Sequence, residues 1–396
     1  MSAYLSVRDL PVEGMRVFLR VDLNVPMRDG AIVDDTRIRE ALPTIRHLLE
    51  RGAKVIACSH MGRPKGQHVP ELSLAPVAQR LRALLPDVTV RFAPDVLGPD
   101  AHAQAGALLP GQVLVLENIR YEAGETKGDP ALAKKIREMA DVYVSDAFGA
   151  VHRPHASVCA AAELFPQVAA GLLLEREVEY LEDRLGNPER PYTAFLGGAK
   201  VSDKIPILRR LSEKVDCLCI GGAMAYTFLA AQGLTSGKSL LEPDLAGACA
   251  EILDLAASRR VEVMLPVDHR AAPSLEAGEA AVVVRADAFP PELAAFDIGP
   301  DTVRLYARQA AASRTIFWNG PMGVFERPAF SEGTLALARA VAKSSALSVI
   351  GGGDSVAAVT LAGVTDQISH ISTGGGASLE LLAGEELPGL QVITKK

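Results

Sequence analysis

The stretch VIGGGDS, Val349–Ser355, joins an apolar run to three glycines and then to an Asp–Ser pair. The pattern predicts a strand that ends in glycines and leads straight into a helix. Glycine lets the backbone turn tightly and lets a ligand approach the main chain. A helix N-terminus beyond the glycines offers free N–H groups and a positive dipole end to a phosphate. The stretch therefore predicts a junction that can bind a phosphate group.

The second half of the chain repeats this junction. Four more stretches have the same pattern: Ala194–Lys200, Cys219–Ala225, Phe317–Gly323 and Ser372–Ser378. A single glycine-rich junction is most simply a tight turn, but five in one half favour nucleotide binding. At the first stretch, Asp354 is a suitable Mg²⁺ ligand, since Mg²⁺ prefers oxygen ligands and bridges protein to phosphates.

Two lysines accompany these glycines. Lys200 and Lys204 are four residues apart at the start of a predicted helix, which would place both on one helix face. Lysine at a helix N-terminus opposes the helix dipole, so the pair needs either an anion or exposure to water. Position alone leaves both interpretations open.

The first half alternates β-rich runs with amphipathic segments. Apolar residues recur at helical spacing in two segments, around Val77 and around Ile136. This alternation predicts βαβ units and a mainly parallel sheet, so the chain is of the α/β class. The expected strands are Val17–Val21, Lys54–Cys58, Val88–Phe92, Val113–Leu116 and Val142–Val144.

A charged helical run separates the two halves. The residues LLLEREVEYLEDRL, followed by GNPERP, predict a helix and its breaker. At roughly 100–200 residues per domain, 396 residues suggest two or three domains. We expect residues 1–173 and 191–383 to form two domains, joined by a helix and hinge at 174–190.

Composition limits the partners and the compartment. The formal charge of −7 argues against nonspecific nucleic-acid binding. The N-terminus lacks the pattern of a signal peptide, and no apolar run reaches the roughly 18–20 residues of a membrane span. The five cysteines have no Cys-x-x-Cys spacing and are expected to be reduced core residues. We therefore expect a cytoplasmic protein without nucleic-acid or membrane partners, and take a monomer as the default.

Cationic side chains follow several strands of the first half. Ligands of open α/β sheets lie beyond the carboxyl ends of the strands. Guanidinium groups there can bind phosphate or carboxylate through paired hydrogen bonds. Asp22 can accept from a substrate hydroxyl, which favours a hydroxy-acid phosphate over free phosphate. The polar residues after these strands include Arg20, Asp22, Asn24, Arg37, His60, Arg63, Asn118, Arg120 and Arg153.

Two other nucleotide motifs do not fit. Gly233–Ser239 resembles a phosphate-binding P-loop, but it is one residue short and follows a helical run. The dinucleotide fingerprint fails because Gly351-x-Gly353 is followed by Val356, where glycine or alanine is expected.

At these motifs the sequence resembles the phosphoglycerate kinase family from end to end. Two departures are mild: Met61 stands where the family more often has leucine, and Pro154 where it more often has alanine. Pro154 restricts the backbone of Arg153. The matching segments, in order, are RVDLNVP, SHMGRPKG, LENIRYEAGE, DAFGAVHRPHAS, FLGGAKVSDKI, IGGAMAYTF, GKSLLE, LPVD, DIGPDT, WNGPMGVFE, GGGDS and STGGGASLE.

The resemblance implies two Rossmann-like domains facing across a cleft, with the C-terminal tail, residues 384–396, returning to the first domain. It implies 3-phosphoglycerate or 1,3-bisphosphoglycerate in the first domain and Mg²⁺ with ADP or ATP in the second. The substrate residues carried over are Asp22, Asn24, Arg37, His60, Arg63, Arg120 and Arg153. The nucleotide residues carried over are Lys200, Lys204, Gly299, Asn319, Glu326, Gly352, Gly353, Asp354 and Ser355.

The implied reaction needs no general base, because both possible nucleophiles, a carboxylate and a phosphate, are anions at neutral pH. Catalysis must then come from alignment and charge neutralisation, with Arg37, Lys200, Lys204 and Mg²⁺ around the transferring group, and Asp354 holding the metal. Ligands on two domains imply hinge closure around residues 175–185.

Two alternatives stay open on the residues alone. One is a nicotinamide-dependent dehydrogenase, against which the incomplete fingerprint and the paired lysines argue. The other is a non-catalytic anion- or nucleotide-binding protein, against which the intact Arg37, Lys200, Lys204 and Asp354 argue.

Overall fold

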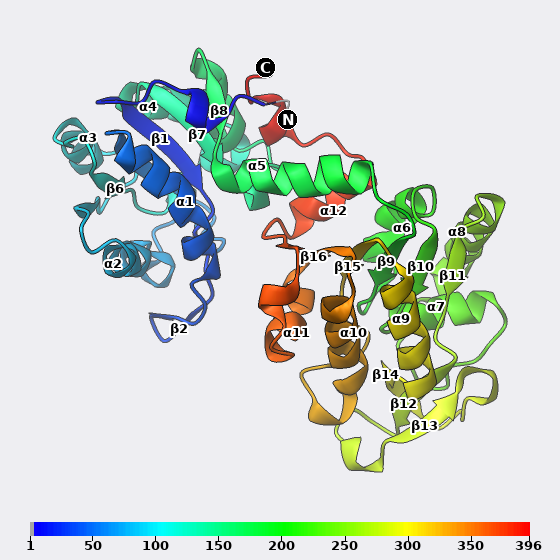
Figure 1. The fold of residues 1–396 in the computed structure, drawn as a ribbon. Coiled ribbons are helices and arrows are strands. Elements are labelled where there is room, and N and C mark those ends of the chain that lie inside the picture. The colour runs from blue at the N-terminus through cyan, green and yellow to red at the C-terminus, as the bar shows by residue number, and fades with distance from the viewer. Residues whose placement is uncertain (1–3) are drawn as a thin grey trace. The chain divides into compact units, whose positions relative to one another are not determined.

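The computed structural model describes residues 4–396, which form two compact units (Figure 1). The first unit contains the residues up to Glu179 together with Glu386–Lys396, and the second contains Tyr180–Glu385. No helix among the described residues is long and apolar enough to cross a membrane.

The first unit is built on a six-stranded sheet with the order β5-β6-β4-β1-β7-β8, in which every pairing is parallel. The strands are almost wholly buried, as expected when helices cover both faces of a parallel sheet. The expected strands are confirmed with small shifts at their ends. Their bounds are β1 Arg16–Val21, β4 Lys54–Cys58, β5 Val90–Phe92, β6 Val113–Val115, β7 Val142–Asp146 and β8 Val168–Ala170.

The helices of this unit follow the apolar periodicity of the sequence. In α1, Ile38, Ala41, Ile45 and Leu48 are buried at spacings of three and four residues. The other helices, α2 Ala75–Leu84, α3 Pro99–Gly106, α4 Pro130–Met139 and α13 Pro388–Gln391, accompany α1, Thr36–Glu50.

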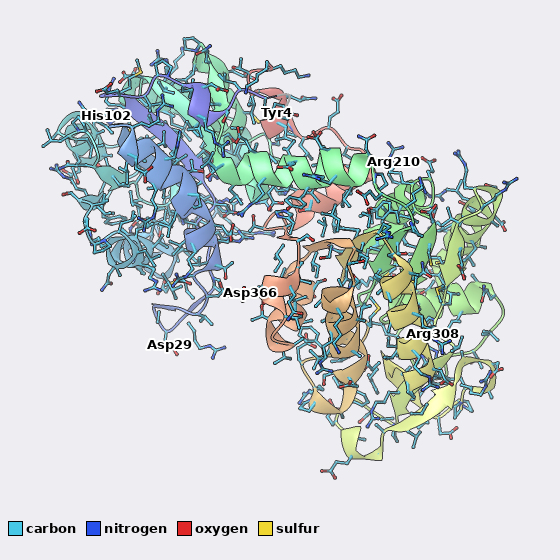
Figure 2. The ribbon with its side chains drawn as sticks, viewed as in Figure 1. Tyr4, Asp29, His102, Arg210, Arg308 and Asp366 are labelled. Carbon is cyan, nitrogen blue, oxygen red and sulfur yellow. The ribbon has the colours of Figure 1, made fainter. Side chains whose placement is uncertain are left out.

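A short hairpin precedes α1. Its strands, β2 Met27–Arg28 and β3 Ala31–Ile32, are antiparallel. Asp29 and Gly30 form the turn with positive φ angles of 50° and 77°, as in the Asp-Gly turns that suit a two-residue hairpin. Figure 2 shows Asp29 at the tip of this hairpin.

The last residues of the chain pack with the first unit. The Leu5 amide donates to the Thr394 carbonyl at 2.7 Å, and the Gly389 amide donates to the Val151 carbonyl at 2.8 Å. The Val168 amide also donates to the Thr394 hydroxyl at 2.9 Å, so the tail is attached beside β8.

The charged helical run begins as α5, Leu172–Val178, and continues as a π-helix over Glu179–Arg184. The division between the two units falls at this change of helix type, between Glu179 and Tyr180. A regular α-helix was expected over the whole run. The wider i→i+5 pattern is uncommon and occurs frequently at functional positions.

The second unit has a six-stranded parallel sheet with the order β11-β10-β9-β15-β16-β17. A separate antiparallel sheet has the order β13-β12-β14. The strands are β9 Tyr192–Leu196, β10 Cys217–Ile220, β11 Glu262–Met264, β12 Asp268–Ala272, β13 Val282–Arg285, β14 Ala294–Ile298, β15 Thr315–Asn319, β16 Leu347–Gly351 and β17 His370–Ile371. The helices are α6 Ile205–Leu211, α7 Met224–Ala231, α8 Ala246–Ser258, α9 Pro300–Ala312, α10 Glu332–Lys343, α11 Gly353–Leu361 and α12 Gly376–Ala383.

The expectation that all five glycine junctions lead straight into helices is wrong for two of them. After β9 and after β15, a loop intervenes before α6 and α10. The chain cannot turn at once into a helix there, because the two loops pack on each other. A side chain at Gly197 would place Cβ 2.0 Å from the Pro321 carbonyl oxygen.

The placement of Lys200 and Lys204 on one helix face is also wrong. Lys200 lies in the loop after β9, and Lys204 ends a 3₁₀ turn directly before α6. Pro206 fixes the start of α6, because proline suits the first helical turn. The Glu242 carboxylate accepts from the amides of Val201 and Ser202 at 2.7 and 3.1 Å, which holds this segment as a loop.

The five cysteines are free and buried. Cys217 and Cys219 lie on one face of β10 with their sulfur atoms 3.8 Å apart, as their alternation in the sequence indicates.

Candidate active site

The polar residues of the first unit meet at the carboxyl edge of its sheet. Strands β6, β4, β1 and β7 are neighbours there, and the order of the chain reverses between β1 and β7. Such a switch point forms the ligand crevice of an open α/β sheet. Because the strands are parallel, the residues that follow them come together from segments far apart in the sequence.

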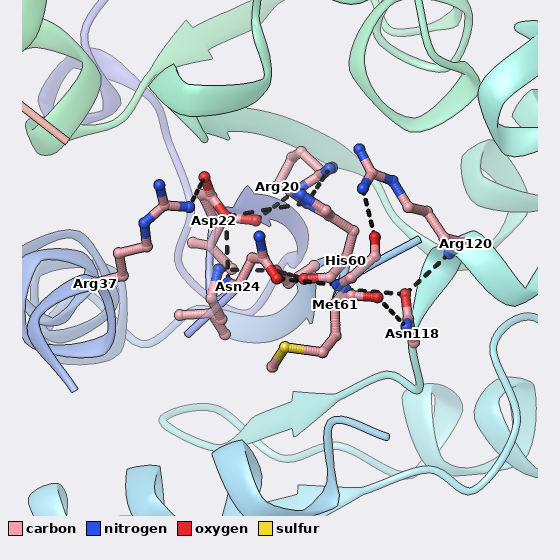
Figure 3. A network of polar contacts seen from close by, with 12 residues as sticks. Arg20, Asp22, Asn24, Arg37, His60, Met61, Asn118 and Arg120 are labelled. Atoms are coloured by element: carbon pink, nitrogen blue, oxygen red, sulfur yellow. Dashed lines mark hydrogen bonds and ion pairs between the residues drawn. The ribbon is translucent and has the colours of Figure 1, made fainter. Parts of the chain in front are cut away.

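Asp22 stands directly after β1 and is the anionic centre of a polar network (Figure 3). Its carboxylate accepts from Arg37 of α1 at 2.6 Å and from the Asn24 amide at 3.2 Å. Burial opposes ionisation, but the attraction of the positive forms of His60, Arg37 and Arg20 outweighs burial and lowers the pKa of Asp22. Asp22 is therefore a fixed negative charge among arginines.

His60 follows β4 and is 4% exposed. Its Nδ1 atom lies 3.4 Å from an Arg20 nitrogen and 3.9 Å from an Asp22 oxygen. Burial and the nearby Arg20, Arg120 and Arg153 hold the pKa of His60 well below its usual value, against the opposing charge of Asp22. The imidazole is therefore neutral at physiological pH.

Two asparagines fix the loop after β4. Asn24 accepts from the Gly62 amide at 3.0 Å. Asn118, after β6, accepts from the amides of Met61 and Arg120 at 3.1 Å each and donates to the Met61 carbonyl at 2.8 Å (Figure 3). The Arg120 side chain donates to the Gly62 carbonyl at 2.6 Å, which joins the exits of β1, β4 and β6.

A cavity of about 580 Å³ opens beside this network, and we call it the basic cavity. Burial and the repulsion of Arg153 and Arg20 lower the pKa of Arg120 to about 10. A bound anion would relieve this repulsion. The charged residues that line the basic cavity are Arg63, Lys65, Arg120, Glu122, Lys127 and Arg153.

All seven sequence-predicted substrate residues thus lie in the first unit, either in the Asp22 network or on the wall of the basic cavity. Pro154, the departure beside Arg153, is exposed, and Arg153 still lines the cavity. Arg20 was expected after the strand but lies within β1 and is 1% exposed.

The second unit has its own cavity, of about 420 Å³, which we call the glycine cavity. It lies where the strand order reverses, between β9 and β15, so it occupies the same topological position as the Asp22 network in the first unit. Seven of the nine predicted nucleotide residues line it: Lys200, Lys204, Asn319, Gly352, Gly353, Asp354 and Ser355.

The other two predicted nucleotide residues do not line this cavity. Gly299 is buried before α9, where a side chain would overlap the Asp268 carboxylate, and Glu326 lies exposed in the loop after β15. Instead, the turn residues Gly197, Gly198 and Gly320 complete the wall. The glycine junctions of the sequence contain all three.

Lys204 is the buried cation of the glycine cavity. It is 9% exposed and donates to the Asn319 side-chain oxygen, while Asn319 donates to the Gly351 carbonyl at 2.8 Å. Burial lowers the pKa of Lys204 to about 8, although Asp203 and Asp354 oppose the shift. An anionic ligand beside Lys204 would stabilise its charged form.

The backbone turn before α11 requires glycine. Gly352 has a φ of +91°, and a Cβ atom there would lie 2.8 Å from the Asn319 side-chain nitrogen. The Ser355 hydroxyl is fully buried and accepts from the Gly320 amide at 2.6 Å, which ties α11 to the turn after β15. The N-terminus of α11, with Asp354 exposed in its first turn, faces the cavity.

Comparison with known proteins decides the family. The family model described as "Phosphoglycerate kinase" matches residues 7–385. The phosphoglycerate kinase of Moorella thermoacetica is 52% identical over 394 residues, covering 100% of both chains, and that of Koribacter versatilis is 51% identical over 400 residues, covering 99% of both. This chain belongs to the phosphoglycerate kinase family.

The fold agrees with solved structures of the family. The phosphoglycerate kinase of Coxiella burnetii superposes with a TM-score of 0.89 at 45% identity, and that of Pyrococcus horikoshii with a TM-score of 0.85 at 35% identity. Each comparison covers 98% of both chains. The family resemblance and the α/β fold expected from the sequence are therefore confirmed.

The family fixes the reaction. The chain is a phosphotransferase that moves a phosphoryl group between 1,3-bisphosphoglycerate and ADP, giving 3-phosphoglycerate and ATP in glycolysis. A carboxyl group is the phosphoryl acceptor in the reverse direction. The dehydrogenase and the non-catalytic binding protein, both open on the residues alone, are set aside.

Proposed function

We propose that the first unit binds the phosphoglycerate and that the second unit binds the nucleotide. The observation that supports this proposal is that each unit has a cavity with cationic side chains near the switch point of its parallel sheet. The basic cavity and the Asp22 network offer several guanidinium groups, as a small, highly charged hydroxy-acid phosphate requires. The glycine cavity offers backbone N–H groups and two lysines, as a nucleoside polyphosphate requires.

In the first unit, the guanidinium groups of Arg63, Arg120 and Arg153 hold the phosphate or carboxylate of the substrate. Asp22 accepts a hydrogen bond from the substrate hydroxyl, which distinguishes a hydroxy acid from free phosphate. Asn24 holds the loop that carries Arg63 through its bond to Gly62.

In the second unit, Lys200, Lys204 and the first turn of α11 hold the nucleotide phosphates. Gly352 and Gly353 let those phosphates approach the main chain. Asn319 orients the Lys204 ammonium group, and Ser355 secures the turn. Gly299 and Glu326 lie outside the glycine cavity, and we assign them to the nucleoside end, with Glu326 accepting from the ribose hydroxyls.

The chemistry of the site fits Mg²⁺ carried by the nucleotide. No group of three His, Cys, Asp or Glu residues that could hold a metal ion occurs among residues 4–396, but Asp354 provides one exposed carboxylate beside the phosphate-binding turn. Mg²⁺ is usually held by one or two carboxylates together with substrate phosphates. When bound, the ion neutralises charge on the nucleotide phosphates.

Phosphoryl transfer then needs alignment rather than proton transfer. A terminal oxygen of ADP attacks the phosphorus of the acyl phosphate, and the bond from phosphorus to the carboxyl oxygen breaks. Both the attacking and the leaving oxygen are anionic, so no base is needed. Arg37, Lys200 and Lys204 offset the charge on the transferring group, an effect worth roughly 10³–10⁵ in rate for such cations.

The test is turnover in a coupled assay, with 3-phosphoglycerate, ATP and Mg²⁺, and an auxiliary dehydrogenase to remove the product. We expect turnover to require both the phosphoglycerate and the metal. Arg37→Ala should lower kcat, whereas Arg39→Ala, which removes a neighbouring exposed arginine paired with Asp35, should not. If Arg37→Ala weakens only substrate binding and leaves kcat near normal, its catalytic role is wrong.

We also propose that the protein acts as a cytoplasmic monomer without nucleic-acid or membrane partners. The net charge of −7 and the five free cysteines support this. Sedimentation of the full chain tests the oligomeric state directly.

A further inference from the structure

A buried chain of three polar side chains supports the Asp22 network from behind. Glu125 lies between β6 and α4, Ser157 follows β7, and Arg20 lies within β1. Their exposed fractions are 0%, 0% and 1%. The three residues therefore connect three strand exits through the interior of the unit.

The Ser157 hydroxyl is the central link. It accepts from the Arg20 Nε atom at 2.8 Å and donates to a Glu125 carboxylate oxygen at 2.6 Å. The Ser157 amide donates to the other oxygen of Glu125 at 2.8 Å. A buried cation and a buried anion are thus bridged by one hydroxyl, and each would cost several kcal/mol to bury alone.

The hydrogen bonds of Glu125 lead to Arg20, and the charge of Arg120 also acts on Glu125. His155 Nδ1 lies 3.7 Å from a Glu125 oxygen, but burial and the nearby Arg120, Arg20 and Arg153 lower the pKa of His155 to about 4, so His155 is neutral at physiological pH. The charge of Glu125 is therefore paired with Arg20 through Ser157.

The other end of Arg20 reaches His60. An Arg20 Nη atom lies 3.4 Å from His60 Nδ1, and guanidinium nitrogens only donate hydrogen bonds. The Asp22 oxygen that also faces Nδ1 is 3.9 Å away, beyond hydrogen-bond distance, so Arg20 decides the role of Nδ1. Nδ1 then accepts, and in a neutral imidazole the proton is on Nε2. The opposite tautomer would put two donors face to face in a buried site, with the loss of a hydrogen bond.

His60 Nε2 makes no hydrogen bond within residues 4–396 and is not among their buried, unpartnered polar atoms. A ligand can therefore receive its proton as a hydrogen bond. An anionic substrate oxygen accepts from N–H but is repelled by the lone pair that the opposite tautomer would present. The tautomer of His60 thus decides whether it attracts or repels the substrate.

We propose that Glu125 and Ser157 are positioning residues that hold Arg20 against His60 and so fix the His60 tautomer with Nε2–H available to the phosphoglycerate. Neither residue touches the substrate. The proposal rests on the assignment of the phosphoglycerate to the first unit. Glu125 and Ser157 lie within the motifs LENIRYEAGE and DAFGAVHRPHAS, but nothing in the sequence alone singles them out.

The direct test is ¹⁵N NMR of the ligand-free, full-length protein with labelled histidines, with the His60 signals assigned by comparison with His60→Gln. We expect Nδ1 of His60 to be unprotonated and Nε2 to carry the proton. A proton on Nδ1 overturns the proposal, and no substitution in the chain is needed to see it.

Variants then test the positioning. In Ser157→Ala we expect a mixture of His60 tautomers and a 3-phosphoglycerate affinity reduced about 10-fold, the value of one charge-assisted hydrogen bond, with the affinity for ATP unchanged. Ser157→Thr, which keeps the hydroxyl, should restore most of the affinity. Ser212→Ala removes another fully buried serine hydroxyl, directly after α6, and should change neither quantity.

Should Ser157→Ala not fold, Glu125→Gln serves in its place, because it keeps the size of the side chain and removes the charge. If either variant lowers the thermal stability but leaves the 3-phosphoglycerate affinity and the His60 tautomer unchanged, Glu125 and Ser157 have a purely structural role. Failure of the assignment of the phosphoglycerate to the first unit would look different. In that case, adding 3-phosphoglycerate would not shift the His60 signals of the wild-type protein.

Discussion

Lys204 lies in the wall of the glycine cavity, where burial lowers its pKa to about 8. A bound nucleotide phosphate favours the charged ammonium and should raise this pKa. At pH 8, Lys204 is neutral in about half of the ligand-free molecules, so binding ADP should take up about half a proton per molecule. We expect ADP affinity to fall as the pH rises through 8, since the deprotonated lysine must then gain a proton on binding.

Titration calorimetry in buffers of different ionisation enthalpy measures this uptake. Lys204→Arg provides the control, because arginine stays charged throughout this range. Its ADP binding should take up no proton. Equal proton uptake by the wild type and Lys204→Arg would show that another group is responsible.

His269, on β12, is a second buried titrating residue. It is 1% exposed, contacts Tyr226 and Phe289 edge-on, and neither of its ring nitrogens has a partner among the described residues. Burial lowers its pKa to about 4, against the opposing charge of Asp268. As the pH falls, the unfolded chain therefore binds a proton at His269 before the folded chain does. The contribution of neutral His269 to the free energy of unfolding is full above pH 6.5 and is lost as the pH falls toward 4.

Between pH 7 and pH 5 this loss amounts to about 2 kcal/mol. His269→Phe should remove it, because phenylalanine fits an aromatic cluster and does not titrate. Chemical unfolding of the full chain at both pH values checks the prediction, with the exposed His68→Phe as control. If His269→Phe is as acid-sensitive as the wild type, His269 is not the group that protonates.

Single residues differ in how far the sequence predicts them. Asp22, Arg120 and Lys204 follow strands of a recognisable α/β pattern, so their position at a ligand-binding edge can be inferred. Glu125 and Ser157 cannot be inferred in this way, because their roles depend on contacts between residues far apart in the sequence. Ser157, for example, contacts Arg20 across 137 residues. Local patterns report faces and ends of elements, and they do not report which buried polar groups meet.

At the scale of elements, the parallel strands were predictable because each is a short apolar run buried on both faces. The loop that carries Lys200 was not predictable. The four-residue spacing of Lys200 and Lys204 is typical of a helix, but the Glu242 carboxylate holds the segment as a loop. The π-helix after α5 was not predictable either. Its residues have ordinary helical composition, and the change of helix type leaves no mark in the sequence.

The start of α5 depends on Asp146 at the end of β7. One carboxylate oxygen accepts from the amides of Leu173 and Leu174 at 3.0 and 3.1 Å. Burial raises the pKa of Asp146 to about 7, against the opposing hydrogen bonds. The folded state therefore holds the proton more tightly than the unfolded state, and this contribution to stability is lost as the pH rises through 7.

Asp146→Asn should keep the acceptor for α5 and remove the titration. Between pH 6 and pH 8, the wild type should lose about 1.4 kcal/mol of unfolding free energy relative to this variant. Asp87→Asn, which changes an exposed aspartate, should behave as the wild type does. Parallel pH profiles for the wild type and Asp146→Asn would mean that Asp146 is already ionised in the folded protein.

At the scale of the whole molecule, the sequence predicted two parallel-sheet domains because the same alternation of strand and helix runs through both halves. The antiparallel sheet of β12, β13 and β14 was not predicted. Its β13 strand is short and mostly exposed, and its residues VVVR do not alternate between apolar and polar as a half-buried strand would. What the sequence conveys best at this scale is the repeated architecture of the two units.

The proposed assignment puts the two substrates on different units, so transfer requires the units to close on each other. We expect closure to bend the chain around residues 175–185, where α5 passes into the π-helix and the two units divide. Closure excludes water, which would otherwise hydrolyse the acyl phosphate. On the proposed assignment, cations of both units act on one transferring group, so we expect neither substrate alone to produce full closure.

Small-angle scattering should therefore show a smaller radius of gyration with 3-phosphoglycerate and Mg-nucleotide together than with either alone. Lys204→Ala, at concentrations where calorimetry still shows both ligands bound, should compact less, because on the proposed assignment it removes one of the cations that act on the transferring phosphoryl group. An unchanged radius of gyration in the wild type, with both ligands bound, would contradict closure. Transfer would then have to occur in the arrangement that the free protein already has, and the change of helix type after α5 would have no part in it.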